Sequence, residues 1–185
     1  MTNEIYGIDY LRRRLADKQT RVLLRYKYYE MKNNAQDFSS LAPEKFKGLK
    51  ETVGWCAKAV DSLADRLQFD EFQNDEFDLS EIFLSNNQDI LIDSAVLSAL
   101  ISACSFVYIR EDNGYPRLQV IDGSNATGII DPVTNLLTEG YAVLERDSMG
   151  VVKTEAYFMA GMTEIYSHGV LVQRIPNAAP YALLV

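Results

Sequence analysis

The pattern of apolar residues changes once along the chain, near residue 105, and this change constrains the fold more than any other feature. Before it, apolar residues recur at the three- and four-residue spacing of amphipathic helices. After it, short runs rich in Val, Ile and Tyr alternate with turn residues, as in antiparallel sheets. Helices followed by strands with short connections predict an α+β fold in which an antiparallel β-meander follows N-terminal helices.

Two helices are expected in the first 67 residues. The segment 6–32 has good helix formers and no proline, and Asp9 is its candidate N-cap. Such a charged helix could cover its own domain or cross to another subunit, and the sequence favours neither. Residues 33–42 are polar and predict a loop, after which Pro43 should begin the second helix. Glycines predict a kink or a break near Gly54–Trp55. The apolar residues of the second helix step by three and four along one stripe, which we expect to be core: Phe46, Leu49, Val53, Cys56, Val60, Leu63 and Leu67.

The middle of the chain predicts a short helix over 79–85 and a longer one over 88–104. Between Ile90 and Ile109 only Asp93 is charged, so a membrane span has to be considered. Asp93, four serines and the lack of basic residues on the N-terminal flank argue against it. We therefore expect a buried helix that runs into a buried strand.

Six strands are expected in the remainder. Asn113-Gly114 is a strong signal for a hairpin turn. The predicted strands are 106–110, 117–121, 138–146, 151–159, 163–166 and 170–175. Further turns are expected at Asp122-Gly123, Asp131-Pro132, Ser148-Met149-Gly150 and Ser167-His168-Gly169.

Charge is distributed unevenly along a chain whose net charge is −8. Residues 1–32 hold eight Lys or Arg and four Asp or Glu, whereas residues 68–93 hold eight Asp or Glu and no basic residue. The acidic segment repels phosphate, which argues against a nucleic-acid clamp. It predicts either a solvated acidic loop or a docking surface for a basic partner.

The residues available for catalysis are few. His168 is the single histidine and lies in a predicted turn, and neither a nucleophile elbow nor a phosphate-binding glycine loop is present. Asp61 and Asp65 lie one helical turn apart, but we expect them to form ion pairs with Lys58 and Arg66 and not to act as acid and base. We therefore expect no enzyme, no cofactor and no catalytic residue.

Metal binding is not expected either. Sites with several His or Cys ligands are excluded by number. A carboxylate site, as in a metal-dependent hydrolase, would have to use residues that lack the spacing of a calcium loop: Asp70, Glu71, Asp75, Glu76 and Asp78. Cys56 and Cys104 are predicted to be buried free thiols of a protein made in a reducing cytoplasm.

The two ends of the chain carry further expectations. Residues 1–7 lack the basic region of a signal peptide. The chain ends on the apolar run Ala182-Leu183-Leu184-Val185, and such an end predicts a polypeptide cut within a longer protein.

Several segments resemble, in order and spacing, the portal proteins of long-tailed phages. Ala59-Val60-Asp61-Ser62-Leu63-Ala64-Asp65-Arg66-Leu67 is similar to the family's V-D-x-x-A-D-R-L helix, and Tyr26, Tyr28 and Tyr29 match the tyrosine cluster before it. In the family an acidic linker and a short helix ending in Asn follow, matched here by Phe83 to Asn87. The remaining matches are Ala103 to Ile109 (G-x-S-F-V-x-V in the family), Pro116 to Asp122 (P-x-I-x-x-x-D), and Asp131-Pro132. The resemblance covers about residues 20–135. The family often has glycine at the position of Ala103 or Cys104, and the strands after Val143 match in pattern only.

The resemblance implies a structural subunit of a ring, usually dodecameric, at one vertex of the virion capsid. Terminase pumps double-stranded DNA in through such a ring, and the DNA leaves through it at infection. Residues 1–42 would be an N-terminal helical arm and loop, and 43–185 a fragment of the wing domain. The implied partners are other portal subunits, capsid or scaffolding protein, terminase and the head-tail adaptor, with assembly in the host bacterial cytoplasm. No DNA-contacting residue is assigned, because the tunnel loops of the family would lie beyond Val185. The alternative is a small intracellular protein-interaction module with an acidic docking face.

Overall fold

The computed structural model describes residues 5–32 and 54–185, and within them four helices precede seven strands, so the fold is α+β as predicted. The helices are α1 (Ile8–Tyr29), α2 (Trp55–Ala64), α3 (Leu79–Ser85) and α4 (Gln88–Ser102). The strands are β1 (Ser105–Asp112), β2 (Tyr115–Asp122), β3 (Ala126–Ile130), β4 (Leu137–Arg146), β5 (Val152–Met159), β6 (Met162–Ser167) and β7 (Val170–Pro176).

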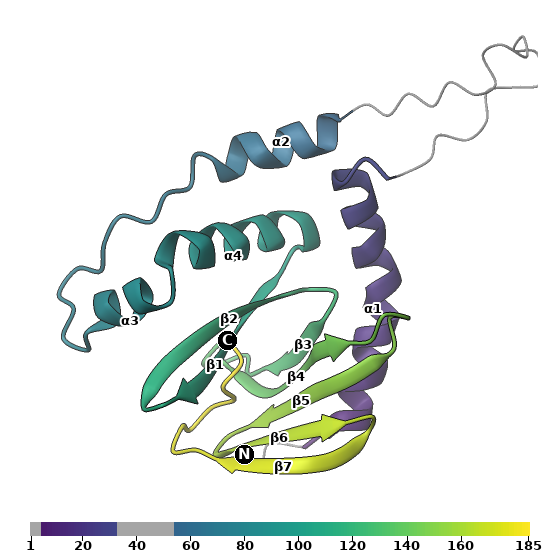
Figure 1. Cartoon of the computed structure of the whole chain (residues 1–185), viewed down its shortest axis with the longest axis vertical. Helices are drawn as coiled ribbons and strands as arrows, with labels where there is room; N and C mark the ends of the chain where they lie inside the picture. Colours follow the sequence, from purple (N-terminus) through teal and green to yellow (C-terminus); the bar gives the residue numbers. More distant parts are fainter. Residues whose placement is uncertain (1–4, 33–53) are drawn as a thin grey trace, which may run out of the picture.

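The strands form two antiparallel sheets. Strands β3 to β7 make a five-stranded meander in which sequence neighbours are also neighbours in the sheet, while β1 and β2 form a separate hairpin. The hairpin lies between α4 and the five-stranded sheet (Figure 1). The predicted antiparallel meander is thus confirmed. Its first two predicted strands, β1 and β2, belong to a separate sheet that forms a second layer.

Two of the predicted hairpin turns have the backbone that their residues favour. Asn113 and Gly114 have φ of 53° and 83°, and His168 and Gly169 have φ of 49° and 78°. Two successive residues with positive φ match the right-handed twist of the flanking strands, and Asn-Gly tolerates them well. His168 is therefore an exposed turn residue, as its position in the sequence predicts.

Strand β3 is not among the strands predicted from the sequence. It contains Gly128, and glycine is unfavourable inside a strand when only the sequence is considered. A Cβ at Gly128 would lie 2.7 Å from a methyl of Leu137 and 2.9 Å from the carbonyl oxygen of Glu139. The glycine therefore allows the close approach of β3 to β4, a role that glycine takes in strands and that only the tertiary structure reveals.

The main core lies between the hairpin and the five-stranded sheet. Phe158 is fully buried there, with its ring centre 4.9 Å from that of Tyr108 in an edge-to-face arrangement. The last residues join this core: Leu184 is fully buried, and backbone hydrogen bonds connect Leu183 and Val185 to β1. The apolar run at 182–185 thus continues the hairpin by a short stretch of strand.

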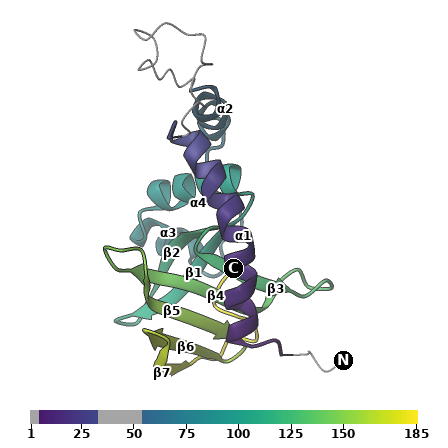
Figure 2. The same cartoon turned by 90° about the vertical axis from the view of Figure 1, so that its right-hand side faces the viewer.

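Helix α1 covers the other face of the five-stranded sheet and runs along the length of the molecule (Figure 2). Leu11 and Leu15 are buried against Tyr141, Val143 and Tyr157. Because strand residues alternate between faces, β4 and β5 supply both this contact and the main core. The first helix therefore packs on the sheet of its own chain.

The prediction that the apolar stripe of the second helix is buried core is wrong for the part of the stripe that the structure describes. Helix α2 has no buried residue, Leu63 and Leu67 are each 48% exposed, and Cys56 is exposed. Among the described residues the helix packs mainly against α4 and α1, so the face that it covers is narrow. The half-buried residues of that face are Ala57, Val60, Asp61 and Ala64.

Two other burial predictions need correction. Helix α4 is buried on one side only, since Ser98 and Ser102 are buried while Ile90 is 69% exposed. The Ser102 hydroxyl donates to the carbonyl oxygen of Ser98 (2.7 Å), which lets it face the interior. Both cysteines are free thiols, but Cys104 is only half-buried and Cys56 is exposed.

Some predictions lie outside the described residues. They are the loop over 33–42, the domain division at residue 42, the start of the second helix at Pro43, and the stripe positions Phe46, Leu49 and Val53. Helix α2 begins at Trp55 and has Gly54 as its N-cap, so a helix boundary falls where a kink or break is predicted.

Candidate functional site

Three glutamates of the five-stranded sheet are buried on the face that α1 covers, and each accepts a hydrogen bond from a tyrosine. Glu139, on β4, is 4% exposed and accepts from the Tyr157 hydroxyl on β5 (2.5 Å). Its two oxygens also accept from the backbone N–H groups of Tyr6 (2.8 Å) and Gly7 (2.9 Å). A carboxylate of the sheet therefore holds the N-terminus of α1.

The second glutamate, Glu155 on β5, holds the same helix one turn further on. Its oxygens accept from Arg12 Nε (3.2 Å) and Nη2 (2.5 Å) and from the Tyr141 hydroxyl. Arg12 also donates to Asp9 (2.8 Å). Arg12 is thus the cation that α1 supplies to the buried carboxylate, and its fork geometry suits such a pair.

The third glutamate, Glu164 on β6, lies toward the edge of the sheet. It accepts from the Tyr166 hydroxyl (2.7 Å) and from Arg174 Nε on β7 (2.9 Å). The guanidinium carbon of Arg12 lies 5.5 Å from the centre of the Tyr166 ring, a cation–π contact that links this pair to the second.

The chemical role of this network is to fix α1 on the sheet. Glu139 and Glu155 each accept three hydrogen bonds from the chain itself. Each bond joins the sheet to the helix or one strand to the next. The predicted N-cap is wrong: the N-cap is Gly7, without a side-chain hydrogen bond, and Asp9 lies in the first turn of α1. Glu139, 132 residues from Gly7, replaces it.

The tyrosine hydroxyls of this network should resist ionisation. Burial, followed by the hydrogen bond to a glutamate, raises the pKa of Tyr141 and Tyr157 and raises that of Tyr166 to about 12. The unfolded chain releases a tyrosine proton near pH 10. The stabilisation from these phenols is therefore complete below about pH 10 and is lost as the pH rises through the folded values.

A titration monitored by phenolate absorbance tests this expectation. Part of the tyrosine signal should appear only above about pH 12, together with the loss of near-ultraviolet circular dichroism. Replacing Tyr157 with phenylalanine should reduce this late fraction. A chain that ionises all of its tyrosines near pH 10 while it keeps its native circular dichroism would contradict the network.

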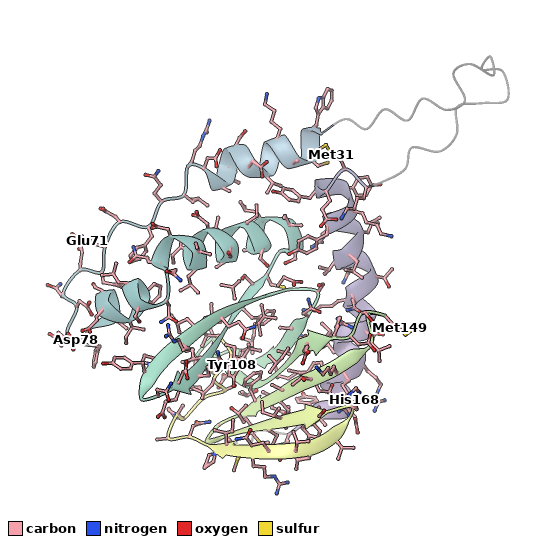
Figure 3. All side chains as sticks on the ribbon, viewed as in Figure 1. Met31, Glu71, Asp78, Tyr108, Met149 and His168 are labelled. Atoms are coloured by element: carbon pink, nitrogen blue, oxygen red, sulfur yellow. The ribbon has the colours of Figure 1, made fainter. Side chains whose placement is uncertain are left out.

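The acidic segment lies on the side of the molecule opposite α1, where Glu71 and Asp78 are labelled in Figure 3. Within it, Asp75 accepts from the backbone N–H groups of Leu79 and Ser80 (2.7 Å each). Hydrogen bonds from Ser80, then from Leu79, lower the pKa of Asp75. Asp75 thus holds the start of α3, and the other carboxylates of the segment face solvent.

The predicted ion pairs of α2 do not form. Asp61 instead accepts a hydrogen bond from the Tyr29 hydroxyl at the end of α1 (2.8 Å). No ion pair within 4.0 Å joins Asp61 or Asp65 to a basic residue of the described chain. Among residues 5–32 and 54–185, no group of three or more His, Cys, Asp or Glu could hold a metal ion.

Two polar side chains join segments that are distant in the sequence. Asn86, at the end of α3, donates to the carbonyl oxygen of Pro116 (3.0 Å) and accepts from the N–H of Leu118 (2.9 Å), so it pairs with β2 as a strand residue would. Arg25 of α1 donates to the carbonyl oxygen of Ser102 at the end of α4 (2.9 Å).

A groove of about 890 Å³ lies between the hairpin and the five-stranded sheet. Its walls combine apolar residues such as Leu144 and Ile165 with Gln119 and Gln173. The volume would suit a small molecule, and the charged residues of the lining, Arg110, Glu111 and Glu145, are all exposed, unlike the buried glutamates under α1.

Comparison with protein-family models and with curated protein sequences finds no match. No helix formed by residues 5–32 or 54–185 has the length and apolar character that a membrane span requires. The tyrosine–glutamate network was not predicted from the sequence. The only signal for it was a glutamate within each of three strands that also contain tyrosine, at Glu139, Glu155 and Glu164.

Proposed function

We propose that this chain is the N-terminal part of the wing domain of a tailed-phage portal subunit. The complete subunit would assemble with its copies into a ring at a capsid vertex of the virion, through which DNA is packaged and ejected. The chain would serve as a wall of that ring. Terminase, the head-tail adaptor and the capsid or scaffolding protein would be its further partners.

The proposal is supported by what the residues that carry the family resemblance do in the fold. Tyr29, of the tyrosine cluster, donates to Asp61, of the V-D-x-x-A-D-R-L segment. Asn86, of the segment after the acidic linker, bonds to the backbone of Pro116 and Leu118, which belong to the strand motif. These segments of the resemblance therefore contact one another in the fold, which supports the proposal.

The buried carboxylates also favour a structural role. Glu139 and Glu155 are saturated by donors from the chain, which leaves them occupied in holding α1 to the sheet. A rigid connection between a long helix and a sheet suits a subunit that has to keep its shape within an assembly.

Electron microscopy of the complete gene product tests this proposal. It should show rings with an axial channel, and ring formation should persist in the absence of nucleic acid. Monomers or solid particles would contradict it.

A protein-interaction module with an acidic docking face is the second candidate. The observation that favours it is the acidic segment, in which Asp70, Glu71, Glu76 and Asp78 are all exposed. None of the four forms an ion pair with a basic residue that the structure describes. A complete gene product that is monomeric, and that binds a basic protein in a salt-dependent manner, would support this candidate over the ring.

A further inference from the structure

One flank of α1 is basic and exposed. Tyr10, Arg14, Arg21, Arg25 and Tyr28 follow one another at intervals of three, four or seven residues, so they lie along one side of the helix. We call these five residues the basic stripe. All five are exposed, and Tyr10 and Tyr28 are 41% and 48% exposed. The stripe thus presents positive charge between two exposed aromatic rings.

The charge of this stripe is not neutralised by the part of the chain that the structure describes. Arg14 and Arg21 form no ion pair with a carboxylate of residues 5–32 or 54–185. Arg14 and Arg21 line a hollow on the helix surface with Tyr10 and Lys18. An exposed arginine and tyrosine surface of this kind has the composition typical of protein interfaces.

The opposite side of the molecule carries the complementary charge together with exposed apolar side chains. We define the acidic flank as Asp70, Glu71, Glu76, Asp78 and Glu81, all of which are exposed. Two apolar residues of the same segment are also exposed, Phe77 at 78% and Leu84 at 70%. These two side chains add exposed apolar area to the acidic flank.

The two surfaces lie on opposite sides of the same molecule. In Figure 1 helix α1 forms one side, and the segment between α2 and α3 projects from the other. Figure 3 places Glu71 and Asp78 at that far side, away from α1. The two surfaces of one chain therefore cannot meet each other, but the stripe of one copy can meet the flank of the next.

We infer that the chain associates with copies of itself head to tail, with the basic stripe of one copy docked on the acidic flank of its neighbour. Opposite charges meet at each contact. Because each copy uses two different surfaces, the association is heterologous and continues from copy to copy until it closes.

A second copy fits the stripe better than a nucleic acid does. A nucleic acid would bring phosphates close to a chain with a net charge of −8, and Asp17 lies beside the stripe on the same helix. The acidic flank, in contrast, has no basic residue between positions 68 and 93 to oppose the arginines. The occupant that the charges favour is therefore this flank of another copy.

Charge reversal in the complete gene product tests the inference. The stripe variant carries Arg14→Glu and Arg21→Glu, and the flank variant carries Glu71→Lys and Glu76→Lys. Each variant should weaken self-association at least about tenfold, since attraction becomes repulsion at every contact. Sedimentation or native mass spectrometry measures the self-association of each variant. Arg110→Glu is the control, since this exposed arginine belongs to the hairpin and should change the association little.

Mixing separates a charge effect from a folding defect. An equimolar mixture of the two variants should associate again, because the stripe of each variant then meets a flank of opposite charge. A single chain with all four substitutions should associate as the original does. If the stripe variant fails to fold, Arg14→Gln with Arg21→Gln replaces it, and if the flank variant fails to fold, Glu71→Gln with Glu76→Gln replaces it. Weaker association is again expected in each case.

Two results would overturn the inference. One is self-association that neither reversal weakens, or that mixing fails to restore although both variants are folded. The other is an unchanged oligomer that loses retention of duplex DNA in the stripe variant, which would assign the stripe to nucleic acid.

The contact between the stripe and the flank does not depend on the proposed function. Only the closure of these contacts into a portal ring rests on it. Rings that persist in both reversal variants would leave the portal proposal standing and reject these contact surfaces. Association that responds to reversal and mixing, but builds open chains or small oligomers without a channel, would reject the portal ring and keep the surfaces.

Discussion

Replacing Phe158 with alanine should lower the free energy of unfolding by about 3–5 kcal/mol, which is the largest effect we expect from one substitution. The Phe158 side chain is fully buried between the hairpin and the five-stranded sheet, in contact with the Tyr108 ring. The substitution removes apolar contacts and leaves a cavity that a sheet held on both sides cannot close. Urea denaturation followed by circular dichroism measures the change.

Met149→Ala is the matched control, since Met149 is 87% exposed in the β4–β5 turn. It should change the free energy of unfolding by less than about 0.5 kcal/mol. A loss below about 1 kcal/mol for Phe158→Ala would show that the hairpin and the sheet do not share one core.

Replacing Arg12 with leucine should lower the free energy of unfolding by about 3 kcal/mol, the second-largest effect that we expect. The Glu155 side chain is 6% exposed, and Arg12 is the only cation that forms an ion pair with it in the described chain. Without the guanidinium, the carboxylate stays buried with the Tyr141 hydroxyl as its remaining donor. A buried charge that loses its partner costs more than the pair contributes when it is intact.

Arg13→Leu provides the control on the same helix. Arg13 is exposed and contacts only the carbonyl oxygen of Asp9 among the described residues, so the substitution should be nearly neutral. Adding Glu155→Gln to Arg12→Leu should restore at least about 1 kcal/mol of the lost free energy of unfolding, because a neutral amide replaces the unpaired charge. Equal losses for Arg12→Leu and Arg13→Leu would mean that the ion pair does not hold α1 to the sheet.

This attachment matters for the inferred contact between copies. Arg14 and Arg21 can face a neighbour only if the buried side of α1, with Leu11 and Leu15, stays on the sheet. Arg12 and Glu139 fix the N-terminal turns of the helix and thereby orient the basic stripe. We therefore expect Arg12→Leu to weaken self-association as well as stability.

Features that depend on neighbouring residues could be predicted from the sequence. The Asn113-Gly114 and His168-Gly169 turns follow from the positive φ that these residues tolerate. Helix α3 has the predicted bounds, Leu79–Ser85, because Asp75 and the residues around it supply its start locally. The separation of basic and acidic charge between 1–32 and 68–93 is likewise visible in the sequence alone.

Features that depend on distant contacts were decided by the tertiary structure. The apolar periodicity of α2 is present in the helix, yet among the described residues α2 packs mainly against α4 and α1, so Leu63 and Leu67 remain exposed. The start of α1 is held by Glu139, far along the chain, and no local rule for helix caps includes such a residue.

The candidate surfaces show the same division. Composition along the sequence determined that one segment is basic and another acidic, because charge is a property of each residue. Only the folded arrangement decided that α1 and the acidic flank occupy opposite sides of the molecule (Figure 3). The packing of α1 on the sheet and of α4 on the hairpin sets those positions, and both depend on contacts between residues that the chain order leaves far apart.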